Sequence, residues 1–190
     1  MPLLDPTPNL PGKPGDRRRW GPLPGGSRGL AIAETVQRAG KVCLAVTRDT
    51  ASAELLADEI AYFAGTNHRV VTFPDWETLI YDAFSPHHDI ISARLAALNQ
   101  LVALSGPAVV VVPANTLMHR LSPRQFALGR SLHLDVGQTL DVNAMRKTLT
   151  AAAYRSVETV YEHGEFALRG SILDVFPMGS DTPFRIDLFD

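Results

Sequence analysis

The run "AVVVV", Ala108 to Val112, most constrains what this chain can fold into. A strand with no polar residue on either face has to be covered on both faces. Two more apolar segments, "KVCLAVT" and "RVVTF", precede it, and helical patterns separate all three. Apolar strands that alternate with amphipathic helices are typical of a parallel sheet. The sequence therefore predicts a doubly wound α/β domain over residues 25–117.

Three helices are expected around these strands. The first ends at Gly40, a C-terminal cap. The second is capped by Asp49 or Thr50, and the third begins at Asp89 behind Pro86. The apolar positions at helical spacing are Leu30, Ala33 and Val36, then Leu56, Ile60 and Phe63, then Ile91, Leu95, Leu98 and Val102.

The pattern changes after Leu117. One helix is expected from Asp141 to Ala153, and short strands with glycine turns follow it. This favours a smaller, antiparallel α+β module over residues 118–190. The last segment, "PFRIDLFD", alternates like a half-buried strand with no partner strand after it, so we expect the module to be incomplete.

Residues 1–24 differ from both modules. They contain seven of the fourteen prolines and the run Arg17 to Arg19, which predicts a flexible or extended leader. The net charge of −2 gives no general reason to expect nucleic acid. A single cysteine, Cys43, fits a reducing cytoplasm, and we expect it in the core. No apolar run is long enough to span a bilayer, so no membrane partner is expected.

The stretch "GPLPGGSRGLAIAET" has the outline of a phosphate-binding loop. A working loop reads G-x-x-x-x-G-K-[ST], in which lysine neutralises phosphate and the hydroxyl binds magnesium. Neither possible frame here supplies both groups. We interpret Gly25, Gly26, Ser27, Arg28 and Gly29 as a degenerate, non-functional loop. The alternative is an ATPase in which Arg28 replaces the lysine.

Three further segments could carry chemistry. His87, His88 and Asp89 suggest a metal site, but no third ligand stands at the required spacing, so a solvated loop with Asp89 as helix cap is favoured. Glu162 to Glu165 could form an acid–base cluster around His163. A tight turn at Gly164 with its charges in water is the preferred interpretation. We therefore predict no catalytic residues and no bound metal.

Trp76, Tyr81 and Phe84 could form a stacking platform for bases, assisted by Arg17 to Arg19. The favoured alternative is a loop that tucks its aromatic side chains under the sheet edge, because no lysine or arginine lies between them. Arginines and aromatics in the second module match the composition of protein–protein hot spots. The candidates for such a surface are Arg155, Arg169, Phe176 and Arg185.

Three blocks carry a family resemblance: "DWETLIYDAFSPHHDIISARLAAL", "VVVVPANTLMHRL" and "YRSVETVYEHGEFALRGSILDVFPMGSDTPFRIDLFD". They resemble the N-terminal region of bacterial transcription-repair coupling factors from about Val42 to Asp190. Ile80 stands where that family usually has proline. The region itself is similar to the excision-repair protein UvrB, which has an intact phosphate loop.

This resemblance implies a degenerate RecA-like domain followed by a module that docks onto UvrA. UvrB inserts a long tyrosine-rich hairpin after the second strand, whereas this chain has only the short segment between Phe73 and Asp89. UvrB docks through arginines around R-x-R-G. The matching "ALRG" keeps Arg169 and has Ala167 at the first position, while Arg155 lies near another docking arginine. Phe176 and Arg185 are added from composition alone.

The resemblance also implies a role. Such a segment would recruit UvrA to stalled RNA polymerase by mimicking UvrB, while a downstream motor uses ATP and Mg²⁺ to move on double-stranded DNA. None of the motor motifs lies in these 190 residues. We therefore expect a cytoplasmic binding module that is not itself an enzyme and has no cofactor. The open alternatives are a nucleotide-binding ATPase fragment and a nucleic-acid-binding module.

Overall fold

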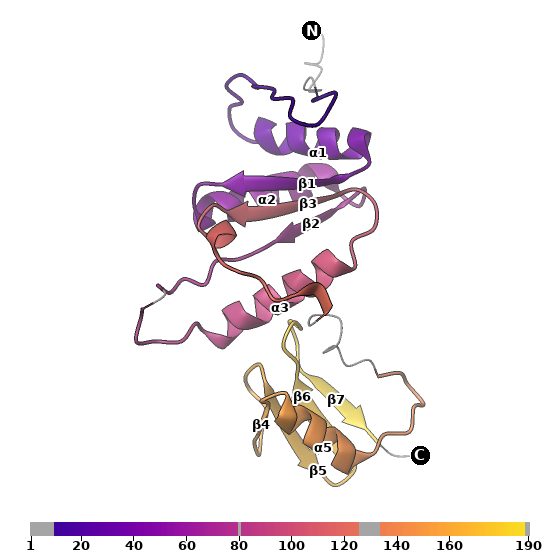
Figure 1. Cartoon of the computed structure of the whole chain (residues 1–190). Coiled ribbons are helices and arrows are strands. Elements are labelled where there is room, and N and C mark those ends of the chain that lie inside the picture. Colours follow the sequence, from indigo (N-terminus) through magenta and orange to yellow (C-terminus); the bar gives the residue numbers. More distant parts are fainter. Residues whose placement is uncertain (1–9, 80, 126–133, 189–190) are drawn as a thin grey trace. The chain divides into compact units, whose positions relative to one another are not determined.

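The computed structural model describes residues 10–79, 81–125 and 134–188. They form two compact units, which we describe separately (Figure 1). Unit 1 comprises the chain up to Asp75 together with Ala103–Leu121, and unit 2 comprises Trp76–Val102 together with the chain from Ser122 onward. The predicted mixed α/β class is confirmed. The expected boundary near Leu117 differs from this division mainly in the third helix, which groups with unit 2.

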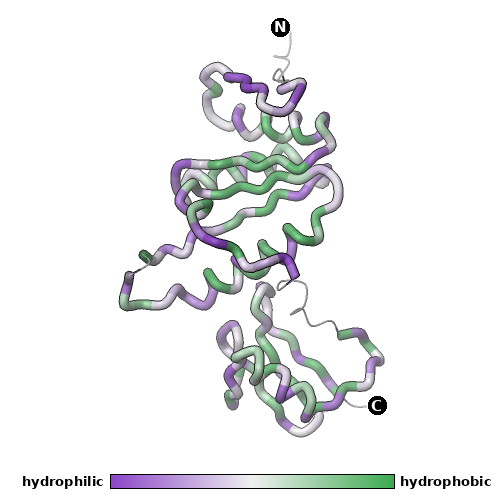
Figure 2. Tube along the Cα trace, viewed as in Figure 1, coloured by the Kyte–Doolittle hydropathy of each residue, from purple (hydrophilic) through white to green (hydrophobic). Residues whose placement is uncertain are grey.

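Unit 1 contains a three-stranded parallel sheet. Its strands are β1 (Val42–Thr47), β2 (Arg69–Thr72) and β3 (Ala108–Pro113), in the order β1-β3-β2. The central strand β3 is buried at every position, as its uninterrupted apolar run predicts. Figure 2 shows its hydrophobic colouring along nearly its whole length.

Two helices, α1 (Ser27–Ala39) and α2 (Thr50–Ala64), pack against this sheet. The predicted helix ends are confirmed. Asp49 Oδ1 accepts a hydrogen bond from the Ser52 amide at 2.8 Å, and Gly40 adopts the left-handed conformation that glycine tolerates best. The buried side chains shared by these helices and the sheet include Val36, Leu56, Ile60, Val109 and Val111.

The first strand is less buried than its sequence predicts. Val42, Leu44 and Val46 each leave about half of their surface exposed, at 51%, 55% and 51%. Strand β1 is an edge strand of the sheet, and only its alternate residues Cys43 and Ala45 contribute to the core with α1 and α2. Burial there raises the pKa of the Cys43 thiol. Within unit 1, strand β1 is apolar on both faces but is covered by other residues on one face only.

Unit 2 contains a four-stranded sheet. Its strands are β4 (Arg155–Ser156), β5 (Glu165–Arg169), β6 (Ile172–Phe176) and β7 (Phe184–Asp187), in that order. The last three are antiparallel, as predicted. The short β4 is parallel to β5 instead. Residues 157–164 therefore bring the chain back to the edge of the sheet at which β4 begins.

Helix α5 (Val142–Ala151) covers one face of this second sheet (Figure 1). Asp141 caps it by accepting from the amides of Asn143 and Ala144, as the sequence predicts. The core beneath the helix contains Met145, Leu149, Phe166, Leu173 and Val175. The opposite sheet face therefore carries the alternate residues of each strand.

Helix α3 (His88–Val102) buries a different face from the one predicted. Its buried residues are Ser92, Arg94 and Ala97, whereas Leu95 is exposed. The Arg94 guanidinium lies 4.1 Å from the centroid of the Trp76 ring, a cation–π contact. The spacing of apolar residues predicted the helix correctly but not its buried arginine, because the aromatic partner of Arg94 lies outside the helix.

The structure assigns no helix or strand to residues 10–24 of the predicted leader. Residues 1–9 and Ile80, the family departure, lie outside the described residues. A 3₁₀ helix, η1 (Thr116–Met118), follows β3. No helix in the described ranges is long and apolar enough to cross a membrane.

Candidate partner-binding face

The four arginine and aromatic residues singled out in the second module lie on one face of the β4–β7 sheet. Ala167, Asp174 and Arg185 are aligned across β5, β6 and β7, and Arg169 lies two residues along from Ala167 on the same face. Helix α5 covers the other face. We call this surface the arginine face and define it by Arg155, Arg169, Phe176 and Arg185.

Asp174 holds two of these arginines. Its carboxylate accepts from Arg169 Nη2 at 2.6 Å, and from Arg185 Nε at 2.7 Å and Nη2 at 2.9 Å. The Asp174 side chain is 11% exposed, whereas those of Arg169 and Arg185 are 55% and 64% exposed. The two hydrogen bonds from Arg185, and then the one from Arg169, lower the pKa of Asp174 to about 2 against the opposing effect of burial. A buried anion thus fixes two exposed cations.

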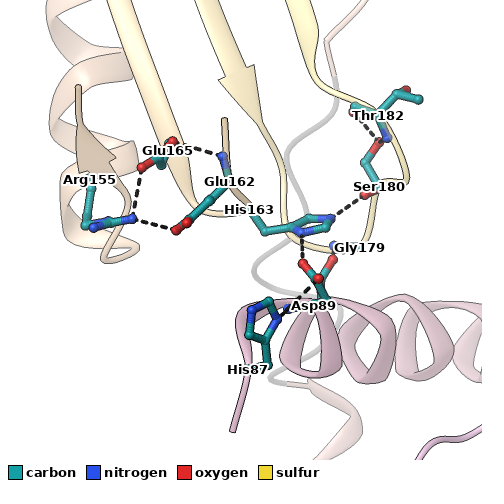
Figure 3. A network of polar contacts seen from close by, with 10 residues as sticks. His87, Asp89, Arg155, Glu162, His163, Glu165, Gly179, Ser180 and Thr182 are labelled. Carbon is teal, nitrogen blue, oxygen red and sulfur yellow. Dashed lines mark hydrogen bonds and ion pairs between the residues drawn. The ribbon is translucent and has the colours of Figure 1, made fainter. Parts of the chain in front are cut away.

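Arg155 is held by two other carboxylates (Figure 3). Its Nη2 lies 3.0 Å from Glu162 Oε2 and 2.9 Å from Glu165 Oε1. Glu165 Oε2 also accepts from the backbone amides of Tyr161 and Glu162, and these hydrogen bonds lower the pKa of Glu165. The expectation that all charges of this turn lie in water was wrong for Glu165, because its carboxylate closes the turn from within.

Phe176 is supported from the side by a histidine. The ring centroids of Phe176 and His163 are 4.0 Å apart. Figure 3 shows the contact of His163 Nδ1 with Asp89 Oδ1, which are 2.9 Å apart. Asp89 was predicted to cap α3, but the helix begins at His88 and Asp89 lies inside its first turn. Its carboxylate pairs with His163 and, through the other oxygen, with His87 at 3.2 Å.

Sequence reasoning found the cations of this face but did not predict which anions hold them. Asp174 and Glu165 are buried, and neither stands at a spacing that pairs it locally with an arginine. Only the strand register brings Asp174 opposite Arg185. Ala167, which stands at the first arginine position of the family pattern, is almost fully buried.

The glycine-rich loop leads directly into α1. Gly25 has a positive φ of 54°, and the Ser27 hydroxyl donates to the Pro24 carbonyl at 2.6 Å. Gly29 has a packing role: a Cβ built on it would lie 2.5 Å from Glu59 Cβ and 2.8 Å from Glu59 C on α2. The non-functional interpretation of this loop stays a prediction, but the need for glycine at position 29 has a steric cause.

A cavity of about 600 Å³ lies beside this loop. Its lining includes Trp20 and Arg28 from the N-terminal part, and Thr47, Arg48 and Ser52 from the β1–α2 junction. Arg48 is already paired with Asp49 at 2.8 Å. Among the described residues that line the cavity, the cations are Arg28 and Arg48, and no lysine is present.

Two candidates from the sequence remain, the metal site and the aromatic loop. Within the described parts of the chain, no group of three or more histidine, cysteine, aspartate or glutamate side chains could hold a metal ion. The aromatic loop is not tucked away as expected: Tyr81 and Phe84 are 97% and 82% exposed. Only Trp76 is partly covered, because Arg94 stacks on it.

Comparison with known proteins connects this face to a described domain. The family described as "UvrB interaction domain" matches residues 132–190, which include the whole arginine face. The chain is 47% identical over 182 residues to the transcription-repair-coupling factor of Escherichia coli strain K12, and 44% identical over 183 residues to that of Haemophilus influenzae. The relative from Mycobacterium tuberculosis is 34% identical over 84% of this chain.

The matches to the first two relatives cover 95% and 96% of this chain, and 16% of each relative. The chain therefore belongs to the transcription-repair coupling factor family, as its resemblance predicted. It spans about a sixth of the length of these relatives.

Proposed function

We propose that this chain is the UvrA-recruiting part of a transcription-repair coupling factor and that the arginine face is its docking surface. It would bring UvrA to a stalled RNA polymerase by presenting the surface that UvrB presents. The motor that uses ATP and Mg²⁺ on double-stranded DNA would lie elsewhere in the full-length protein. The chain itself would act as a binding module without a catalytic site or cofactor.

The observation that carries this proposal is that the four candidate residues lie on one sheet face inside the UvrB interaction domain. The arginine side chains are more than half exposed while buried acids hold them. Exposed, ordered guanidinium groups beside an aromatic ring suit a partner surface that offers carboxylates and an apolar contact.

The two alternatives have less support. A nucleic-acid platform would need cations around the aromatic loop, but the sequence from Asp75 to Asp89 contains four acidic residues and no lysine or arginine. An ATPase would need a phosphate-binding lysine followed by a hydroxyl, and neither frame of the glycine-rich loop supplies both groups. Nucleotide titration of the purified chain would reveal the second alternative directly.

The test is the affinity of the purified chain for UvrA, with Arg169→Ala beside it. Truncation of a hot-spot arginine costs on the order of 2 kcal/mol, so binding should weaken about thirtyfold. The matched control is Arg146→Ala, which removes the same charge from exposed α5 on the other side of unit 2. It should bind like the wild type.

Arg155→Ala and Phe176→Ala map the extent of the surface. Both should weaken UvrA binding, since Arg155 and Phe176 lie on the same face as Arg169. Circular dichroism would establish that each variant is folded. Equal losses for Arg146→Ala and Arg169→Ala would refute the assignment of this face, because net charge alone would then explain the effect.

A further inference from the structure

The cluster around His163 connects the arginine face to helix α3 (Figure 3). His163 Nδ1 lies 2.9 Å from Asp89 Oδ1, and Nε2 lies 2.9 Å from the carbonyl oxygen of Ser180. The side chain is only 13% exposed. Next to it, the Gly179 amide donates to Ser92 Oγ at 2.8 Å, a second contact between α3 and the residues that follow β6.

Both atoms that face the His163 ring are hydrogen-bond acceptors. A carbonyl oxygen and an ionised carboxylate have no proton to donate, and neutral imidazole has one N–H. Neutral His163 can therefore donate to only one of these two oxygens. At the other oxygen, the lone pair of a ring nitrogen faces the lone pair of an acceptor, which is repulsive. Only the doubly protonated imidazolium donates to both Asp89 and Ser180.

The ring of His163 also supports Phe176, whose centroid is 4.0 Å away. We propose that protonated His163 positions Phe176 on the arginine face, so that binding of the partner through this face is stronger at pH 6 than at pH 8. Loss of the proton breaks one of two contacts that hold the ring and lets Phe176 shift. This inference rests on the proposed UvrA-docking function.

The charged neighbours are consistent with a cationic ring at this point. Asp89 on α3 contacts it directly, and His87 shares the other oxygen of that carboxylate. His88 of α3 interacts electrostatically with Glu165. Glu162 and Glu165 flank His163 on its own segment, and Arg155 of β4 is the cation that pairs with both of them. The loop that carries Ser180 adds Asp181.

The first experiment measures UvrA affinity of the whole chain from pH 6 to pH 8. One hydrogen bond is at stake, so the wild type should lose about fivefold in affinity as the pH rises. His163→Gln should show little of this slope, and Asp89→Asn should reduce it. His87→Gln is the matched control: it removes the other histidine on Asp89 without touching Phe176, and should keep the slope.

A second readout does not need the partner. In the free wild-type chain, the Phe176 ring signals in NMR should change between pH 6 and pH 8, and in His163→Gln they should not. Independent behaviour of the two rings would overturn the inference, as would a wild-type binding slope equal to that of His163→Gln. Failure of UvrA docking would appear separately, as equal binding by wild type and Arg169→Ala or none by either.

Discussion

The two sheets of this chain are stabilised differently. In unit 1 the central strand is apolar on both faces, and two helices cover one side of the sheet with small and aliphatic residues. In unit 2 one face packs on α5 while the other carries buried carboxylates that organise exposed arginines. Unit 1 thus depends on steric fit, and unit 2 depends in addition on charge pairing across strands.

The largest expected effect tests steric fit in unit 1. Gly29→Ala places a methyl group within 2.8 Å of the Glu59 backbone, so α1 and α2 must separate. The better helix propensity of alanine offsets less than the clash, and we expect a net loss of about 2 kcal/mol in unfolding free energy. Hydrogen exchange of the β3 amides measures it. Gly21→Ala, which meets no atom within 4 Å, should be neutral; a neutral Gly29→Ala would refute the steric account.

The next effect tests charge pairing in unit 2. Asp174→Asn keeps the side-chain shape but removes the charge that binds Arg169 and Arg185, and should cost about 1 kcal/mol. Because the folded pKa of about 2 lies below the ordinary value of 3.8, the wild-type contribution is present above pH 4 and is lost as the pH falls toward 2.

Hydrogen exchange of the β5 and β6 amides across this pH range would follow the Asp174 contribution. The Asn variant should lack the acid-dependent component that the wild type shows. An identical acid profile in both proteins would mean that the carboxylate of Asp174 does not stabilise unit 2.

The smallest effect concerns a polar group that unit 1 buries. Among the described residues, neither ring nitrogen of His68 has a hydrogen-bond partner, and burial lowers the pKa of its imidazole. The unfolded chain therefore binds a proton near pH 6.5 that the folded unit does not. Unfolding free energy should fall by less than about 1 kcal/mol between pH 7 and pH 5, as measured by urea denaturation. His68→Leu should flatten this slope, and an unchanged slope would assign it to other groups.

Local signals in the sequence predicted much of the fold. The apolar run of β3, the cap at Asp49 and the glycine at position 40 each act within a few residues, and all are confirmed. The predictions that failed depend on distant partners. Arg94 is buried because Trp76 stacks on it, and Leu44 stays exposed because α1 and α2 cover only the face of β1 that carries Cys43 and Ala45.

The candidate site likewise combines features that the sequence predicts with features that depend on distant partners. The family resemblance and composition led to the arginines, whereas Asp174 and the contacts of Glu165 and His163 emerged only from the fold. Their partners stand 5 to 13 residues away in sequence, and the Asp89 partner of His163 stands 74 residues away on α3. No periodic pattern records such pairings, because they depend on which strands become neighbours.

The carboxylates beneath the arginine face have a consequence for the rate and strength of association. Freezing a long side chain at an interface costs about 0.5–1.5 kcal/mol in lost rotamer freedom. Arg169 and Arg185 already share Asp174, and Arg155 is already tied to Glu165, so much of that ordering has taken place before any partner arrives. A surface built in this way can bind with little rearrangement, much as a rigidified ligand does.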